Sequence, residues 1–412
     1  MTRWGSSFVA LRHRNFRLLW AGQLLSITGS MMQMATILWH VALLVPPERK
    51  GLALGMVGLV RVLPLVALAV LGGVFADARD RRRVMLVTQS VMAVLAAVLA
   101  YLTLSHRVTL GLVYLFAGLG AGAAAFDGPA RQSLFPNLVP REHLPNAISL
   151  NTILFQIASV AGPSLGGIVI ATLGVGWVYA FNAASFLAVI VGLLLMRDVP
   201  RRAPGEAGEV SFRAALEGFR FVFRAPLIRG SMLLDFFATF FSSAMALLPI
   251  YAQDILHAGP LAYGWLYAAT SIGALITGVG MVRWIDRIHQ RGRVIFVSVL
   301  AYGLATVGFG LSRTFWITFL CLALVGATDM VSTVLRNVIR QLTTPDALRG
   351  RMTSINMMFF MGGPQLGELE AGLVAHAFGA PFSVVSGGLL CMLATGWIAV
   401  GSPELRRYRR EG

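Results

Sequence analysis

The sequence is poor in the residues on which much of the chemistry of soluble proteins depends. Only 13% of its 412 residues are charged, one is lysine and two are cysteines, whereas about 25% of a soluble domain is charged. Lys50 has no glycine-rich phosphate-binding pattern around it, which excludes a P-loop nucleotide site. Cys321 and Cys391 lie in apolar runs, and no cysteine and histidine cluster has ligand spacing. We therefore expect no disulfide, metal or cofactor.

Apolar sequence is what the chain has in excess. Hydrophobic residues make up 57% of it, and the mean hydropathy is +0.73. The composition excludes a soluble enzyme, because the apolar runs are longer than an aqueous core can use. A membrane-spanning helix needs about 20 apolar residues. We expect twelve such helices, at 16–44, 51–74, 84–104, 109–129, 146–172, 177–196, 228–251, 262–282, 294–312, 315–337, 352–376 and 382–401.

The basic residues are concentrated on one side of these runs. If the N-terminus is cytoplasmic, 29 of the 34 fall in cytoplasmic segments. This bias follows the positive-inside rule and predicts that both termini are cytoplasmic. The net charge of +16 is then a signal of topology, and no nucleic-acid partner is expected.

A polar stretch and an internal repeat divide the chain into two halves. We expect an N-terminal six-helix bundle at 1–196, a cytoplasmic linker at 197–226 and a C-terminal six-helix bundle at 227–412. Arg131-Gln132 is echoed by Arg340-Gln341, and the Gly-Pro-Ser-Leu-Gly at 162–166 returns as Gly-Pro-Gln-Leu-Gly at 363–367. Such repeats are typical of transporters with the substrate site between two related halves.

With these features the chain resembles the major facilitator superfamily over nearly all of its length. The loop after the second run is similar to the Gly-x-x-x-Asp loop of that family, although Ala78 and Asp80 depart from the pattern. The resemblance implies a charge latch at the cytoplasmic gate. The residues that match the latch are Gly73, Asp77, Arg82 and Arg83.

The fifth run carries a second family motif, Gly162-Pro163-Ser-Leu-Gly166-Gly167, which is similar to the Gly-Pro-x-x-Gly-Gly of the exporters. One interpretation is that this chain exports its substrate. The other is tight helix packing with no bearing on direction, because glycine-rich packing is common in membrane helices.

Segments 129–151 and 348–356 are similar to the bacterial branch of enterobactin exporters and transmembrane secretion effectors. That resemblance implies proton-driven export of a small amphiphilic molecule, such as a drug or a siderophore, by alternating access. It also implies a monomer in the bacterial cytoplasmic (inner) membrane. Alternatives are an uptake carrier or lysolipid flippase on the same fold and, in another class, a non-transporting receptor or assembly partner. No enzyme activity is expected.

Few ionisable residues lie inside the apolar runs, where a charge costs about 2.5 to 3.5 kcal/mol. Asp235 shares a helix face with Thr239, and we predict that it couples transport to protons. Glu368 is predicted to be the second protonatable group. The alternative for both is a structural acid that only pairs with neighbouring helices.

The other buried charges have simpler expected roles. Arg61 lies near the midplane and is predicted either to neutralise Asp235 or Glu368 or to receive an anionic group of the substrate. Asp329 shares a face with Arg336 and is a candidate for a charge pair. Asp127 is expected to pair with Arg131, four residues further along its helix.

Uncharged polar side chains recur at helical spacing in several runs. We expect them to line an amphipathic cavity for a small-molecule substrate, although such rows can also bond helix to helix. The predicted cavity residues are Gln23, Ser30, Gln33, Gln156, Thr239 and Gln365.

Overall fold

The computed structural model describes residues 8–78, 80–197, 220 and 222–409. For residues 69–78, and for 346–361 apart from 352, 356 and 359, the description is limited to the backbone. The described chain forms helices and turns without a strand. Within it, eleven helical segments are long and apolar enough to cross a membrane.

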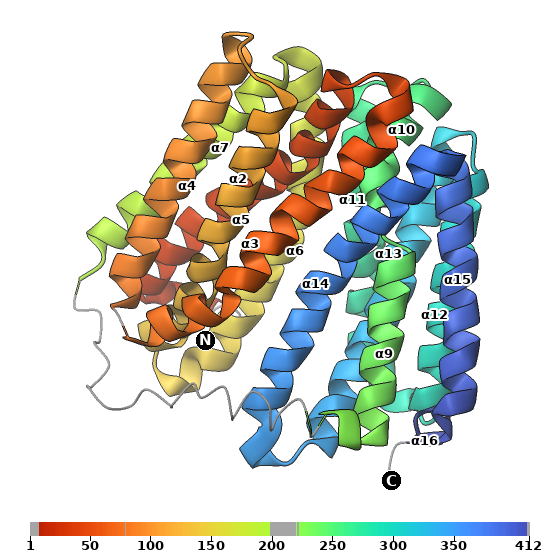
Figure 1. Ribbon diagram of the computed structural model, residues 1–412. Coiled ribbons are helices and arrows are strands. Elements are labelled where there is room, and N and C mark those ends of the chain that lie inside the picture. The colour runs from red at the N-terminus through yellow and green to blue at the C-terminus, as the bar shows by residue number, and fades with distance from the viewer. Residues whose placement is uncertain (1–7, 79, 198–219, 221, 410–412) are drawn as a thin grey trace. The chain divides into compact units, whose positions relative to one another are not determined.

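The helices follow the twelve expected runs (Figure 1). They are α2 (Arg14–Leu44), α3 (Lys50–Ala78), α4 (Arg81–Leu104), α5 (Leu110–Leu134), α6 (Leu144–Thr172), α7 (Val175–Leu195), α9 (Pro226–Phe241), α11 (Pro260–Trp284), α12 (Arg291–Leu311), α13 (Phe315–Thr343), α14 (Asp346–Phe378) and α15 (Ala380–Gly401). Of these, α14 is not among the eleven apolar segments. Its 33 residues extend for about 50 Å at 1.5 Å per residue, which is enough to cross a bilayer. The expectation of an all-helical membrane protein is confirmed, and twelve spans are consistent with the helices observed.

The seventh run is interrupted, whereas the sequence predicted one helix over 228–251. α9 ends at Phe241, and the chain continues through a 3-10 turn η5 (Ala244–Leu247), the short α10 (Leu248–Ile250) and a π-helical turn η6 (Tyr251–Ile255). Two features accompany the interrupted segment. Pro249 has no N–H to donate to the preceding turn, and the hydroxyl of Ser243 donates to the Thr239 carbonyl that the end of α9 leaves open. α9 therefore ends less than two turns after Asp235.

The chain packs as two compact units. Unit 1 comprises Met1–Leu44 and Val60–Glu209, and unit 2 comprises Val45–Leu59 and Val210–Gly412. The beginning of α3 thus packs with unit 2, although it precedes most of unit 1 in sequence. The expected linker at 197–226 lies mainly in 198–219 and 221, outside the described residues, so the boundaries of the two bundles stay a prediction.

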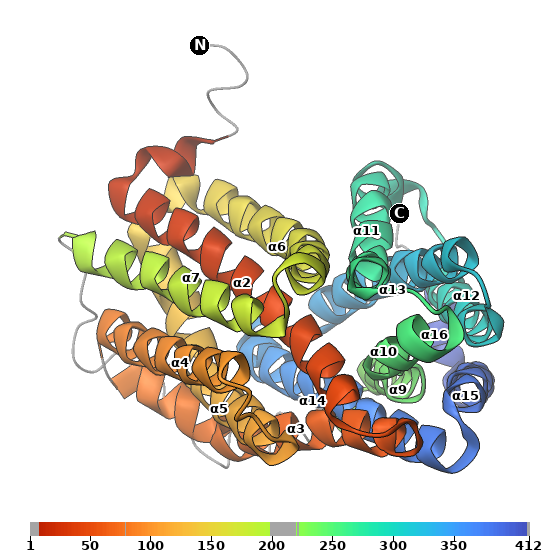
Figure 2. The same ribbon diagram turned by 90° about the horizontal axis from the view of Figure 1, so that it is seen from above.

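In unit 1, α7 packs against both α2 and α4, and α6 packs against the other side of α2 (Figure 2). Small residues allow these helices to approach closely. A Cβ atom at Gly22 of α2 would lie 2.9 Å from the carbonyl oxygen of Ala188 on α7. The backbones of α2 and α7 are therefore close together at this glycine.

In unit 2, α12 lies between α13 and α15, α11 packs along α13, and α9 contacts α14 and α15 (Figure 2). α11 and α13 meet through Gly273 and Gly326, where an added Cβ would overlap the opposite backbone. This packing brings one face of α13 toward α9, and that face carries the charged residues described next.

Candidate functional site

Asp235 of α9 is buried inside unit 2, with 5% of its surface exposed. Its Oδ1 atom lies 2.7 Å from Nη2 of Arg336 on α13, a residue that is only 1% exposed. A charge among apolar helices requires a partner of opposite sign. The close pair therefore explains how two ionised side chains are accommodated in this part of the protein.

Arg336 is anchored along its own helix as well. Its Nη1 donates to the Ser332 hydroxyl at 2.7 Å and its Nη2 donates to the Thr333 hydroxyl at 3.0 Å. The same Nη2 lies 3.6 Å from Oδ1 of Asp329, a half-buried residue two turns earlier on α13. The guanidinium therefore lies between a near carboxylate on α9 and a more distant one on α13.

Arg340 extends the group to a third helix. Its Nη1 lies 4.0 Å from Oδ2 of Asp235, and its guanidinium donates to Asn337 at 2.8 Å and to Asn356 of α14. We call Asp235, Asp329, Arg336 and Arg340 the charge cluster. With two acids and two bases it is formally neutral, and it links α9, α13 and α14.

Arg336 lies near two carboxylates, so the loss of one of them would leave the charge cluster unbalanced. Protonation of Asp235 would remove the carboxylate that lies closest to Arg336, while the carboxylate of Asp329 lies 3.6 Å from the same guanidinium nitrogen. The proton would leave the cluster with one excess positive charge, for which an anionic group is a suitable counter-ion.

Arg61 is not the counter-ion of Asp235, and its pairing with Glu368, the other acid that one interpretation allowed, stays a prediction. The partner of Asp235 is Arg336, and Nη2 of Arg61 contacts Sδ of Met34 on α2 at 3.6 Å within unit 1. A guanidinium against a thioether is weakly satisfied. The other interpretation, that Arg61 receives an anionic group of the substrate, stays a prediction.

Glu368 and Gln365 of α14 lie against the beginning of α3, inside unit 2. A Cβ atom at Gly58 would lie 2.9 Å from Cβ of Glu368 and 2.5 Å from the carbonyl oxygen of Gln365. One turn earlier on α3 and one turn later on α14, Gly55 and Gly372 are in backbone contact. The predicted second protonatable group is thus buried where α3 and α14 touch.

Asp127 has different partners from the one expected. Its Oδ1 accepts hydrogen bonds from the Thr88 hydroxyl and the Gln89 side-chain amide of α4, both at 2.9 Å. The guanidinium of Arg131 instead lies over the ring of Phe155, 5.3 Å from its centre. The prediction of an Asp127–Arg131 pair is wrong, because the two side chains face different helices.

The polar rows divide into side chains with and without partners. Gln33 accepts a hydrogen bond from Asn182 of α7 at 2.7 Å, and the Thr239 hydroxyl donates to the Asp235 carbonyl at 2.8 Å. Gln23 is 2% exposed, and neither its amide nitrogen nor its oxygen has a hydrogen-bond partner among the described residues. The other three predicted cavity residues, Ser30, Gln156 and Gln365, are half-buried. A role in lining a cavity stays a prediction for all six.

The predicted cytoplasmic latch is described only in part. Arg82 donates from Nη2 to the Leu194 carbonyl at 3.2 Å. Asp80, which departs from the family pattern, caps the start of α4 by accepting from the Arg82 N–H at 3.0 Å. Arg83 is exposed, 3.9 Å from Asp80. The side chain of Asp77, and Gly73 beyond its backbone, lie outside the described residues.

The Gly-Pro motif of α6 lies where this helix meets α2. A Cβ atom at Gly162 would lie 2.5 Å from Cβ of Met31, and one at Gly166 would lie 3.6 Å from Cα of Met32. Pro163 and Gly167 are buried in the same helix. The contacts show a packing role for the motif, and its bearing on the direction of transport stays a prediction.

The helix order and the buried charges define a class, the membrane transporters of the major facilitator fold, and solved structures support it. The chain aligns with a bacterial homologue of the human lysosomal transporter Spinster over 100% of both chains, with a TM-score of 0.72 and 14% identity. It aligns with a bacterial homologue of the iron transporter ferroportin over 94% of this chain and 98% of that one, with a TM-score of 0.69 and 18% identity.

The chain belongs to the transmembrane secretion effector family, which it matches over residues 5–408. It is similar to proteins named enterobactin exporter EntS. Identity is 32% with that of Citrobacter koseri and 31% with that of Escherichia coli, in each case over 82% of this chain and 80% of the relative. The protein is therefore a multi-pass membrane transporter that acts on a small molecule, and it is not an enzyme.

Sequence reasoning missed the charge pair that centres the site. The sequence placed Arg336 only on the same helix face as Asp329, and it gave Arg340 only as part of a repeat. The internal repeat was nevertheless the feature of the sequence that could have pointed to Arg340. Arg340 belongs to the echoed Arg-Gln motif, Asn356 ends the segment 348–356 that resembles the exporters, and the structure joins the two residues by a hydrogen bond.

Proposed function

We propose that this transporter is a proton-coupled exporter of a small amphiphilic molecule, such as a siderophore or a drug, and that it works by alternating access. The observation that carries the proposal is the charge cluster, in which Asp235 of α9 contacts Arg336 of α13 inside membrane-spanning helices. The relatives named enterobactin exporters support export and a siderophore-like substrate.

Proton coupling would work through competition for Arg336. When Asp235 is ionised, it holds Arg336 and so ties α9 to α13. When Asp235 is protonated, Arg336 can turn toward Asp329 or toward an acidic group on the substrate. Binding of a proton and binding of an anionic substrate would then favour different arrangements of the two helices, which is the requirement for coupled transport.

The contact between the beginning of α3 and α14 is the proposed gate. Lys50 is buried and contacts Asp254 at 2.8 Å, and its Nζ also donates to Gln253 at 3.0 Å. Gly55 and Gly372 continue the contact along the two helices. The Lys50 pair joins the beginning of α3 to η6, whereas small residues join it to α14. Because neither contact buries large apolar side chains, the beginning of α3 can separate from both without exposing a large apolar surface, as alternating access requires.

We place the transporter in the bacterial cytoplasmic membrane as a monomer, with both termini cytoplasmic. The arginine bias between the two sides supports that orientation. Export then means movement of the substrate out of the cytoplasm as protons enter.

Purified protein in liposomes with an imposed pH gradient tests the proposal. Siderophores, amphiphilic drugs and lysolipids are added in turn, and proton movement and substrate movement are recorded together. We expect a response to at least one siderophore or drug, and its loss in Asp235→Asn, which keeps the shape of the side chain. Asp127→Asn is the matched control, because it removes a buried carboxylate whose partners among the described residues are the uncharged Thr88 and Gln89.

Two results would contradict the proposal. One is full substrate transport by Asp235→Asn with unchanged dependence on the pH gradient. The other is a response restricted to lysolipids, which would indicate a flippase.

A further inference from the structure

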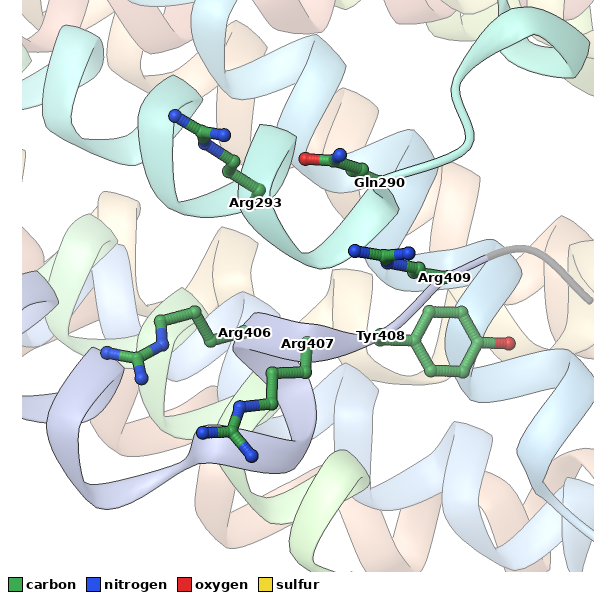
Figure 3. A pocket seen from close by; sticks show the side chains of 6 residues that line it. All are labelled: Gln290, Arg293, Arg406, Arg407, Tyr408 and Arg409. Carbon is green, nitrogen blue, oxygen red and sulfur yellow. The ribbon is translucent and has the colours of Figure 1, made fainter.

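A basic cavity of about 570 Å³ lies at one end of unit 2, and no residue of the charge cluster lines it (Figure 3). Two segments that are distant in sequence form it, the start of α12 and the region around the short α16 (Pro403–Arg407). Its lining residues are Gln290, Arg293, Arg406, Arg407, Tyr408 and Arg409.

The fold brings the two segments together at a glycine. The Gly292 N–H donates to the Tyr408 carbonyl at 3.1 Å, and a Cβ atom at position 292 would overlap the carbonyl oxygen of Leu405. Leu405, in the middle of α16, is fully buried. Arg406 and Arg407 are therefore held at fixed positions beside Arg293 and do not belong to a free tail.

Four guanidinium groups gather around this cavity, and among the described residues none of them forms an ion pair. Figure 3 shows Arg293 and Gln290 on one side of the cavity and Arg406, Arg407 and Arg409 on the other. The positive-inside rule accounts for arginines at the ends of membrane-spanning helices. It does not require arginines from two separate segments to surround one cavity, where their mutual repulsion is unfavourable.

The cavity lies at the level where a membrane meets water. α12 begins at Arg291 and α15 ends at Gly401, so both apolar spans stop at this cavity. Trp397, which is exposed one turn before the end of α15, is typical of the headgroup region. This placement follows from the helix ends and does not depend on which side of the membrane is cytoplasmic.

We propose that this basic cavity binds the phosphate groups of an anionic phospholipid. Guanidinium groups bind phosphate oxygens through paired hydrogen bonds, and basic pockets at the ends of transmembrane helices suit lipid headgroups. Free phosphate offers the same chemistry, but the position at the ends of the spans favours a lipid. With four positive charges present, a lipid with two phosphates binds more tightly than one with a single phosphate, and a zwitterionic lipid binds least.

The test measures lipid binding to the purified full-length transporter in a neutral detergent, by native mass spectrometry and by the shift in Tm. The probes are cardiolipin, phosphatidylglycerol, phosphatidylcholine and inorganic phosphate. The variant is Arg406→Gln with Arg407→Gln. Arg283→Gln with Arg287→Gln is the matched control, because it removes two exposed arginines from the end of α11 and the turn after it, outside the cavity.

We expect cardiolipin to bind more tightly than phosphatidylglycerol, and the cavity variant to bind it at least about tenfold more weakly than the control. Equal weakening in the two variants would overturn the proposal in favour of a general surface charge effect. Equal binding of inorganic phosphate and lipid at matched phosphate concentration would also overturn it. Arg293→Gln, on the other side of the cavity, repeats the test if the double variant does not fold.

Discussion

Asp127 in unit 1 and Asp235 in unit 2 are both buried carboxylates on membrane-spanning helices, but the two units hold them by different chemistry. Asp127 accepts hydrogen bonds from an uncharged hydroxyl and an uncharged amide. Asp235 contacts Arg336 directly and lies within 4.0 Å of Arg340. A change of charge at Asp127 releases no opposite charge, whereas a change at Asp235 frees a buried guanidinium.

The internal repeat makes this contrast sharper. Arg131 and Arg340 occupy corresponding places in the two halves, and the residue four positions before each is Asp127 in the first half and Arg336 in the second. The same position therefore carries an acid in one half and a base in the other. We infer that the repeated architecture has specialised, with charge rearrangement assigned to unit 2 and uncharged hydrogen bonding to unit 1.

The largest effect on the free energy of unfolding is expected from removal of one partner of the Asp235–Arg336 pair in unit 2. Asp235→Ala leaves Arg336 buried without its nearest counter-ion, and removal of one partner of a buried ion pair costs about 3 to 5 kcal/mol. We expect a reduction of that order in the free energy of unfolding, measured by denaturant titration in mixed micelles. Asp235→Ala combined with Arg336→Leu removes both charges, so it should be less destabilised than Asp235→Ala alone.

If the double variant lost as much stability as the two single variants together, the two charges would not interact, and the contrast between the units would fail. Asp329→Ala gives a graded comparison in the same cluster. Because the Asp329 carboxylate lies 3.6 Å from Arg336 and is half-buried, its removal should cost less than removal of Asp235.

The next largest effect on the free energy of unfolding is expected at Gly162 and Gly363, two glycines that correspond in the internal repeat. A Cβ atom at Gly162 would lie 2.5 Å from Cβ of Met31 and 2.9 Å from a backbone oxygen of α2, whereas one at Gly363 would lie 3.0 Å from the movable hydroxyl of Thr239. Gly162→Ala should therefore lower the free energy of unfolding by about 1 to 3 kcal/mol through overpacking. Gly363→Ala should change it by less than about 1 kcal/mol. Denaturant titration of the two variants measures this difference. Equal losses of free energy of unfolding would show that the two Gly-Pro motifs pack alike.

A smaller effect is expected at the carboxylate of unit 1. Asp127→Asn retains an oxygen that can accept from Thr88 and Gln89, so we expect the free energy of unfolding to change by less than about 1 kcal/mol. Asp127→Ala leaves both donors without an acceptor and should cost about 1 to 3 kcal/mol. A loss in Asp127→Asn as large as that in Asp235→Ala would indicate an ionic partner for Asp127 and would remove the distinction between the units.

Much of the fold could be predicted from the sequence, because a bilayer restricts the choices. Apolar runs of about 20 residues and arginine-rich breaks placed each helix near its observed limits. The break in the seventh run was missed, since hydropathy does not change where Pro249 and the two serines at 242 and 243 interrupt the helix. The packing of 45–59 with unit 2 depends on contacts between distant segments, which no local pattern encodes.

The site was predicted less completely for a related reason. Its ionisable residues were identified from their positions inside apolar runs, and Asp235 is indeed buried in an ion pair. Which acid meets which base depends on helix rotation and packing. Sequence spacing therefore favoured pairing within one helix for Asp127, and the structure shows pairing between helices.

The smallest effect is expected at the exposed pair of unit 1. Nε of Arg83 lies 3.9 Å from Oδ2 of Asp80, and the arginine side chain is 79% exposed. Because water screens such a pair, Arg83→Gln should change the free energy of unfolding by less than about 0.5 kcal/mol, and by less still at high salt concentration. Asp80→Ala should cost about 1 kcal/mol, because it also removes the cap of α4. If Arg83→Gln cost as much as Asp80→Ala, the role of Asp80 would lie in the ion pair, and exposure would be a poor guide to which charge pairs of this transporter stabilise it.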